Sequence, residues 1–178
     1  MTRIIAGALR GRRLATPRGS DTRPTSDRVR EALFSSLESE LSGFDGLRVL
    51  DLYAGSGALG LEALSRGAAH ADFVESDRNA AAVIKRNVAE LGVPQDSARV
   101  HAVPVDRFVS KLVDGFDLIF LDPPYKVPAD EVAAVISALP PGGLIVVERS
   151  SREAFAWPES RSGLRERRYG ETTLWYGR

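Results

Sequence analysis

From residue 47 onward, short apolar runs alternate with amphipathic segments. The apolar runs are bounded by turn residues and are typical of strands buried on both faces of a parallel sheet; they are residues 47–52, 71–75, 99–103, 116–121 and 144–148. The segments between them have helical spacing or helical end signals; they are residues 58–66, 77–91, 106–113 and 129–139. This alternation predicts an α/β fold with a doubly wound, mostly parallel sheet.

The two ends of the chain depart from this alternation. Residues 164–168 and 172–176 flank a glycine with no room for a helix, which predicts a C-terminal antiparallel hairpin and brings the sheet to seven strands. Residues 1–24 are rich in glycine, proline and arginine, and predict a basic N-terminal arm or hairpin. A helix follows, capped by Thr25 or Ser26. We expect the arm to be an appendage of one domain formed by residues 25–178.

The composition excludes several classes of function. The 178-residue chain has no cysteine and two histidines, so we expect no disulfide, no thiolate nucleophile and no metal site. No apolar run approaches the roughly 20 residues that span a bilayer, and no apolar segment follows the N-terminal arginines as in a secretory signal. We therefore expect a cytoplasmic protein without a membrane partner, and nothing in the sequence demands more than a monomer.

The charge is balanced overall but segregated along the chain. Residues 1–31 hold eight arginines and three acidic residues, and residues 149–178 hold seven arginines and four acidic residues, whereas the segment between them is acidic. Basic ends around an acidic body indicate segments that bind a polyanion such as nucleic acid. Solvated surface charge would produce the same pattern, so this observation alone does not decide between the two.

The first strand of the alternating region ends in a glycine-rich loop that reads Asp51-Leu-Tyr-Ala-Gly55-Ser-Gly57-Ala-Leu-Gly60. Open parallel sheets bind ligands at this edge, and glycines let a ligand approach backbone N–H groups closely. Glu75 ends the next strand, where a carboxylate can accept hydrogen bonds from ribose hydroxyls. Asp106 follows the third strand, where an adenine is expected. The loop therefore predicts a site for an adenosine-containing cofactor.

Asp51 distinguishes between two such cofactors. Residues 55–60 also match the G-x-G-x-x-G pattern of dinucleotide-binding loops. However, a carboxylate directed into the crevice would repel a pyrophosphate, whereas it suits the ammonium group of S-adenosylmethionine. The sequence also shows no evident acid–base partner for hydride transfer. These features favour S-adenosylmethionine, although Asp51 could simply cap the loop.

The fourth strand ends in the motif Asp122-Pro123-Pro124-Tyr125. Two prolines cannot continue a strand, so the chain leaves the sheet at its carboxyl edge. An exocyclic amine of a nucleobase is a poor nucleophile, and the Asp122 carboxylate and the Pro123 carbonyl are suited to accept its two N–H bonds. Tyr125 could stack on the base, which is worth about 1–3 kcal/mol. The motif therefore predicts N-methylation of a nucleobase, with a rigid surface turn as the alternative.

These motifs, in this order, resemble class I S-adenosylmethionine-dependent methyltransferases that act on exocyclic amines. The segments Arg3-Ile-Ile-Ala-Gly, Gly11-Arg12-Arg13-Leu14 and Arg23-Pro24-Thr25-Ser26-Asp27 narrow the resemblance to the RsmD family, along essentially the whole chain. Members of this bacterial family methylate N2 of one guanine in 16S rRNA. The resemblance implies a Rossmann-like class I methyltransferase fold, S-adenosylmethionine as cofactor, and 16S rRNA in an assembled or assembling small ribosomal subunit as partner.

The resemblance also implies roles for individual residues. Those that would hold the cofactor are Asp51, Tyr53, Ala54, Gly55, Ser56, Gly57, Glu75, Asp106 and Thr25. Those that would hold the target base are Asp122, Pro123 and Tyr125. Those that would contact RNA phosphates are Arg10, Arg12, Arg13 and Arg23. Family members can carry phenylalanine where this chain has Tyr125, and either ring can stack.

Three alternatives remain open at this stage. A DNA adenine N6-methyltransferase would use the same Asp-Pro-Pro-Tyr motif, although the chain has no additional domain to read a DNA sequence. An NAD-dependent dehydrogenase would use the glycine loop, and Asp51 opposes it. A non-catalytic nucleic-acid-binding module would need only the basic ends, and it predicts no cofactor binding and no effect of Asp122→Ala.

Overall fold

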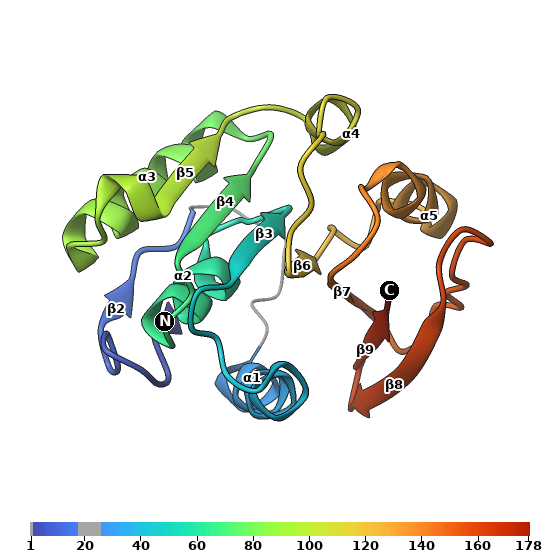
Figure 1. The fold of residues 1–178 in the computed structure, drawn as a ribbon, viewed down its shortest axis with the longest axis horizontal. Coiled ribbons are helices and arrows are strands. Elements are labelled where there is room, and N and C mark those ends of the chain that lie inside the picture. The colour runs from blue at the N-terminus through green and yellow to red at the C-terminus, as the bar shows by residue number, and fades with distance from the viewer. Residues whose placement is uncertain (1, 18–25) are drawn as a thin grey trace.

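The computed structural model describes residues 2–17 and 26–178, and a seven-stranded sheet forms its centre (Figure 1). The strands of this sheet are β3 (Arg48–Leu52), β4 (His70–Val74), β5 (Ala98–His101), β6 (Leu118–Leu121), β7 (Leu144–Ser150), β8 (Gly163–Tyr169) and β9 (Thr172–Gly177). The helices are α1 (Asp27–Leu41), α2 (Ala58–Ser65), α3 (Arg78–Leu91), α4 (Val105–Val109) and α5 (Ala129–Ala138), with a 3-10 turn, η1 (Gln95–Ser97). Two short strands, β1 (Thr2–Arg3) and β2 (Arg13–Leu14), pair separately.

The strand order across the sheet is β5-β4-β3-β6-β7-β9-β8. The first five strands of this order run parallel, and β9 and β8 add an antiparallel hairpin at the β7 edge. The predicted doubly wound sheet of seven strands and the predicted C-terminal hairpin are therefore confirmed. The fourth predicted helix is shorter than expected, because α4 ends at Val109 and the following turn leaves Val113 87% exposed.

Two hydrophobic layers cover the two faces of the sheet. Strand β6 illustrates the division, because Leu118 and Phe120 face the layer that contains α1, α2 and α3, while Ile119 and Leu121 face the layer that contains α4 and α5. In Figure 1 these two groups of helices lie on opposite sides of the central strands. Burial on both faces explains why strands β3, β4, β6 and β7 are largely apolar runs rather than alternating ones. The edge strand β5, which was also expected to be buried on both faces, is only partly buried, and its Arg99 is exposed.

The first helix begins after Ser26, which is one of the two capping residues expected from the sequence. The Ser26 side chain accepts a hydrogen bond from the Val29 N–H at 3.3 Å, which caps α1. The buried face of α1 includes Arg30, whose guanidinium donates to the Arg3 carbonyl at 2.5 Å and to Asp27 at 2.9 Å. This buried arginine therefore connects α1 to the N-terminal strand.

Residues 2–17 form a hairpin that is anchored to the domain. The carboxylate of Glu62, fully buried on α2, accepts the N–H groups of Ile5 and Ala6 at 2.7 and 3.0 Å. Leu14 of the hairpin is buried in the same hydrophobic layer as α1 and α2. The described part of the basic arm is thus held by a buried ionic group and by apolar contacts.

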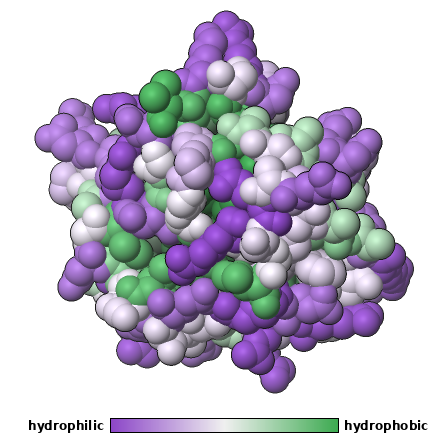
Figure 2. Space-filling view, turned by 45° about the vertical axis from the view of Figure 1, so that its right-hand side comes forward, coloured by the Kyte–Doolittle hydropathy of each residue, from purple (hydrophilic) through white to green (hydrophobic). Residues whose placement is uncertain are grey.

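Figure 2 shows one face of the molecule as a mosaic, in which hydrophilic surface separates small hydrophobic areas. The large hydrophobic side chains with high exposure in the described residues are Val113, Tyr125 and Leu164, and they come from three separate parts of the chain. No helix within the described residues is long and apolar enough to cross a membrane.

At the β5 edge of the sheet, Asp72 joins two histidines. Its carboxylate is bonded to His101 at 2.6 Å and to His70 at 3.1 Å, and so links β4 to the end of β5. Burial alone would raise the pKa of Asp72, but the hydrogen bonds and charges of His101 and His70 outweigh it and hold that pKa below its ordinary value. Ionised Asp72 therefore stabilises this edge.

We expect Asp72→Asn to lower the free energy of unfolding near neutral pH by about 1–3 kcal/mol, because it weakens hydrogen bonds to a charged group. Since the folded-state pKa of Asp72 lies below the unfolded one, its stabilisation is present above the unfolded pKa and is lost as pH falls through the folded pKa. Urea unfolding at a series of pH values measures this. A difference between the two proteins that stays constant down to the acid limit would contradict it.

Candidate active site

Strand pairing brings the two sequence motifs together. β3 pairs in parallel with β6, so the glycine loop after β3 and the Asp122-Pro123 loop after β6 leave the sheet side by side. In this register Asp51 is level with Phe120, and Leu52 is level with Leu121. Asp122 therefore lies one residue beyond the paired segment, on the same face as Asp51, because side chains alternate along a strand. The prediction that these motifs are neighbours is confirmed.

The glycine loop makes a tight turn between β3 and α2. Tyr53, Gly55 and Gly57 all have positive φ values, of 60°, 57° and 78°. The Gly57 N–H donates to the Ala54 carbonyl at 2.7 Å and closes the turn. Glycine suits this conformation, but Tyr53 is strained in it, and strain of this kind is concentrated at binding sites.

Asp51 lies beneath this loop and is 1% exposed. It accepts a hydrogen bond from the Gly60 N–H at 2.9 Å. Burial raises the pKa of Asp51 to about 7, with a further contribution from the charge of Glu75, although the Gly60 bond opposes the shift. Asp51 thus caps the start of α2 and also remains a buried carboxylate that an ammonium group would stabilise.

Glu75 follows β4 and also contacts the glycine loop. One carboxylate oxygen accepts the Gly55 N–H at 2.9 Å, and the other accepts the Asp77 N–H at the same distance. A carboxylate oxygen can accept more than one hydrogen bond. Glu75 therefore holds the loop and retains capacity for ligand hydroxyls, so its predicted ribose contact is chemically compatible with its structural role.

A pocket of about 480 Å³ opens beside the loop, between α4 and α5. Tyr53 and Asp106 line it, together with Val105, Val109 and Val135. Its wall is mainly apolar with a few polar groups, as expected for the site of an adenine ring. The structure thus places Asp106 next to Tyr53, while the roles of both in cofactor binding stay predictions.

The loop after β6 presents the second motif. Pro123 is buried, whereas Tyr125 is 48% exposed. The Val127 N–H donates to the Pro124 carbonyl at 2.8 Å, which closes a turn and stiffens the loop. An exposed aromatic ring on a stiff loop, three residues after Asp122, is available to stack on a base.

Asp122 is surrounded by acidic groups. Part of the residue is accessible to solvent, but protein encloses its carboxylate. This removal from water, with the charges of Glu148 and Asp51, raises the pKa of Asp122 well above its ordinary value, and Arg149 only partly offsets the effect. Perturbed carboxylates in a crevice are typical of catalytic sites.

Sequence reasoning missed three buried residues around the site. Asn87 on α3 donates to the Ser56 carbonyl at 2.9 Å and also bonds Ala15 of the arm. Arg149, 1% exposed, donates to the Val127 carbonyl at 2.9 Å and supports the second motif from the other face of the sheet. The third buried residue is Glu148 on β7. In the sequence, Glu148 and Arg149 could have been noticed as polar residues within an apolar strand.

The predicted RNA-binding arginines fall into two groups. Arg10, Arg12 and Arg13 are exposed on the hairpin, and Arg12 also donates to the Glu90 carbonyl. Arg23, like the predicted cofactor residue Thr25, lies outside the described residues. The structure therefore places three of these arginines at the surface, and their contact with RNA stays a prediction.

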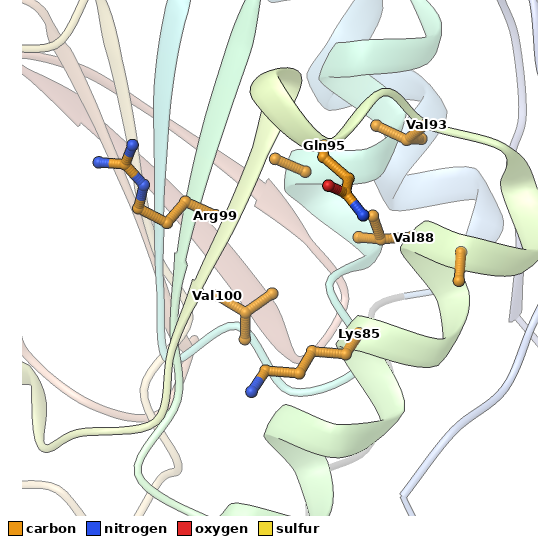
Figure 3. Close-up of a pocket in the computed structure, with 8 residues that line it drawn as sticks. Lys85, Val88, Val93, Gln95, Arg99 and Val100 are labelled. Atoms are coloured by element: carbon orange, nitrogen blue, oxygen red, sulfur yellow. The ribbon is translucent and has the colours of Figure 1, made fainter.

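A second pocket, also about 480 Å³, lies between α3 and β5 (Figure 3). The residues that line it include Lys85, Val88, Val93, Arg99 and Val100, and in Figure 3 the Arg99 side chain points away from those on α3. The pocket includes the end of α3 and the start of β5, so it lies toward the amino ends of the strands. It is thus remote from both motifs, which follow the carboxyl ends.

This fold and these two loops define the class of protein. The structure of magnesium protoporphyrin IX methyltransferase from Synechocystis, solved with bound S-adenosylmethionine, aligns with a TM-score of 0.65 at 14% identity, over 84% of this chain and 77% of that one. At this identity the likeness shows the fold alone. The parallel sheet with its terminal antiparallel hairpin is the class I methyltransferase fold. Relatives 36% and 42% identical to this chain are named ribosomal RNA methyltransferases, and the chain is an S-adenosylmethionine-dependent methyltransferase.

The comparisons also give the family. The model described as Conserved hypothetical protein 95 matches residues 2–178, and the chain belongs to this family, the RsmD family indicated by its motifs. Ribosomal RNA small subunit methyltransferase D of Haemophilus influenzae is 36% identical over 174 residues, covering 94% of this chain and 89% of that protein. A hypothetical protein of Thermus thermophilus aligns with a TM-score of 0.82 at 34% identity, over 99% and 98% of the two chains.

We expect cofactor affinity to rise with pH, because only ionised Asp51 attracts an ammonium group. With a pKa of about 7, the dissociation constant of S-adenosylhomocysteine, which keeps that ammonium, should fall about tenfold between roughly pH 6 and pH 8. Calorimetric titration measures it. The Asp51→Asn variant should bind S-adenosylhomocysteine weakly, with an affinity that does not change between these pH values. If its affinity rose with pH as steeply as that of the wild type, a group other than Asp51 would cause the pH dependence.

Proposed function

We propose that this protein methylates the exocyclic N2 amine of a guanine in 16S rRNA, using S-adenosylmethionine. The observation that carries the proposal is the juxtaposition of the buried Asp51 carboxylate and the Asp122-Pro123 loop at the ends of neighbouring strands. The name of the Haemophilus relative supports ribosomal RNA of the small subunit as the substrate. The choice of the guanine N2 amine as the methylated group comes from the resemblance to the RsmD family.

The residues present fit the cofactor. Asp51 offers an unusually basic buried carboxylate for the ammonium group, and Glu75 offers acceptor capacity for the ribose hydroxyls. The pocket lined by Tyr53 and Asp106 suits the adenine. When bound, S-adenosylmethionine supplies an electrophilic methyl group whose bond to sulfur breaks, with both electrons left on sulfur, as the nitrogen–carbon bond forms.

Asp122 and Pro123 would act on the other reactant. The Asp122 carboxylate and the Pro123 carbonyl would each accept one N–H of the amine, which fixes the nitrogen and directs its lone pair. After methylation the nitrogen carries a positive charge and loses a proton, which Asp122 can accept because its pKa is raised. Tyr125 would hold the base by stacking.

The proposal also covers the RNA contacts of the N-terminal arm, the small ribosomal subunit as the form of the substrate, and the oligomeric state of the protein. Exposed Arg10, Arg12 and Arg13 would contact RNA phosphates, with Arg23 as a further contact. Both motifs come from one chain, so we propose that a monomer acts on rRNA within an assembled or assembling small subunit. With this substrate, the reaction would take place in the cytoplasm.

Methyl transfer from labelled S-adenosylmethionine tests the function directly. Unmodified small subunits, naked 16S rRNA and duplex DNA are offered in parallel, and the products are digested to nucleosides and identified by mass. We expect N2-methylguanosine from the ribosomal samples. N6-methyladenine from DNA would support the alternative DNA methyltransferase, and the absence of any cofactor binding would support a non-catalytic nucleic-acid-binding module.

Asp122→Ala should preserve cofactor binding and lower turnover at least about 100-fold, because it removes both an acceptor for the amine and the proton acceptor. Single-turnover methyl transfer measures the loss, and calorimetry measures cofactor affinity. Asp114→Ala, at an exposed aspartate on another loop, is the matched control and should be silent. Full activity of Asp122→Ala would remove this residue from the mechanism.

Charge reversal at Arg10, Arg12 and Arg13 should weaken RNA binding and reduce its salt dependence, by about one unit of log–log slope for each phosphate that is no longer neutralised. Filter binding at several salt concentrations measures both effects. Cofactor affinity should stay unchanged, and the melting temperature should fall only slightly, through loss of the hydrogen bond from Arg12 to the Glu90 carbonyl. RNA binding by the control Lys111→Glu should stay unchanged. An unaltered salt slope in the triple variant would show that the arm does not contact phosphate.

A further inference from the structure

Most of the basic C-terminal segment lies outside the site formed by the two motifs. Residues 149–178 hold seven arginines. Four of them donate side-chain hydrogen bonds to other groups of the protein; they are Arg149, Arg152, Arg161 and Arg165. The other three are exposed, and within the described residues no hydrogen bond or ion pair holds their side chains; they are Arg167, Arg168 and Arg178. These three cations are available to a ligand.

Strand pairing places one of the three level with the second motif. Arg167 on β8 pairs with Leu174 on β9, and Leu174 pairs with Glu148 on β7. β6 and β7 pair in parallel, and Asp122 and Glu148 are the next two residues after their paired segment. One row of residues therefore crosses the neighbouring strands β6, β7, β9 and β8 from Asp122 to Arg167.

Arg167 also points to the same face of the sheet as Asp122. Residues directly opposite each other in paired strands share a face, and Leu174 is buried in the hydrophobic layer that contains Phe120. Phe120 lies two residues before Asp122, so the two share a face as well. Arg165, two residues before Arg167, confirms the orientation of β8, because it bonds to α1 in this layer.

The other two free arginines lie elsewhere. Arg168 points to the opposite face of β8, because side chains alternate along a strand. Arg178 follows Gly177, which pairs with Ile145 near the start of β7, so it lies toward the amino ends of the parallel strands. Arg167 is therefore the one of the three that shares both the face and the level of Asp122.

The span from Asp122 to Arg167 fits a nucleotide and its neighbours. Three strand spacings of about 4.8 Å separate the two backbone positions, or about 14 Å in total. A base whose amine is held at Asp122 has backbone phosphates within this distance, and a guanidinium binds two phosphate oxygens at once. We propose that Arg167 contacts a phosphate of the RNA strand next to the target base. This inference rests on the proposed function and adds an RNA contact to it.

Arg167 and the N-terminal arm would hold the RNA from two sides. In Figure 1, β2 of the arm and β8 lie on opposite sides of β3 and β6, the strands that lead into the two motifs. Phosphate contacts fix the register and orientation of a nucleic acid without reading its sequence. Contacts on both sides would therefore position the target base at the Asp122-Pro123 loop.

Protection of the sheet edge is the competing explanation for Arg167. β8 is an edge strand, and charged side chains on an edge oppose pairing with another chain. Arg167 and Arg168 would serve that purpose equally, whereas only Arg167 shares a face with Asp122. Arg168 is therefore a matched control, because it is an exposed arginine on the same strand.

Arg167→Ala should lower kcat/KM for unmodified small subunits about tenfold, as expected for the loss of a hydrogen bond between charged groups. It should also reduce the salt dependence of RNA binding by about one unit of log–log slope. Arg168→Ala should keep the wild-type values, and Arg167→Lys should keep the wild-type slope because it retains the charge. Methyl-transfer kinetics and filter binding at several salt concentrations measure these effects.

A second measurement locates the phosphate. Small subunits are reconstituted with 16S rRNA that carries one uncharged methylphosphonate linkage beside the target guanine. At the contacted linkage, the wild-type protein should lose as much activity as Arg167→Ala loses on unmodified subunits. Arg167→Ala should lose no further activity there, whereas Arg168→Ala should respond like the wild type.

The outcomes separate this inference from the proposed function. If Arg168→Ala weakens methyl transfer as much as Arg167→Ala, or if neither changes it, the inference is wrong while the proposed function stands. If the wild-type protein transfers no methyl group to small subunits, the proposed function itself is wrong. All variants should keep the wild-type melting temperature and affinity for S-adenosylhomocysteine, because both side chains are exposed and free of partners in the described structure.

Discussion

The parallel pairing of β3 with β6 is the constraint on which the site depends. It sets Asp51 level with Phe120 and puts Asp122 one step beyond, on the same face. A slip of one residue would turn that face over and separate the carboxylates. The register is held by apolar side chains buried on both faces of these strands, so the hydrophobic core and the geometry of the site are specified by the same contacts.

The buried carboxylates at the carboxyl edge of the sheet have weaker internal partners than the buried carboxylate of Glu62. Glu62 is buried but accepts two backbone N–H groups and pairs with Arg66, so its charge is compensated within the protein. Asp51 and Asp122 instead have raised pKa values, which means that burial outweighs their internal partners. Their ionised forms gain most when a ligand provides ammonium or N–H groups, as expected where binding, rather than stability, has shaped the structure.

The order of elements and both motifs could be predicted because their signals are local: apolar runs, glycine turns and a proline pair. Residues whose roles depend on distant pairing could not. Glu62 gives no sign in the sequence that it binds backbone 57 residues away, and Asn87 reads as an ordinary polar residue of an amphipathic helix. In the sequence, Glu148 could be seen only as a charged residue at the end of an apolar strand. Its position next to Asp122 could be learned only from the pairing of β6 with β7.

Asn87 has a consequence for how the two ends of the site communicate. Its side-chain amide donates to Ser56 in the glycine loop and exchanges hydrogen bonds with Ala15 in the arm. The same group thus contacts the segment assigned to the cofactor and the segment assigned to RNA. Because of thermodynamic linkage, any coupling through Asn87 is reciprocal. If RNA bound to the arm increases the affinity of the loop for the cofactor, the cofactor increases the affinity of the arm for RNA by the same factor.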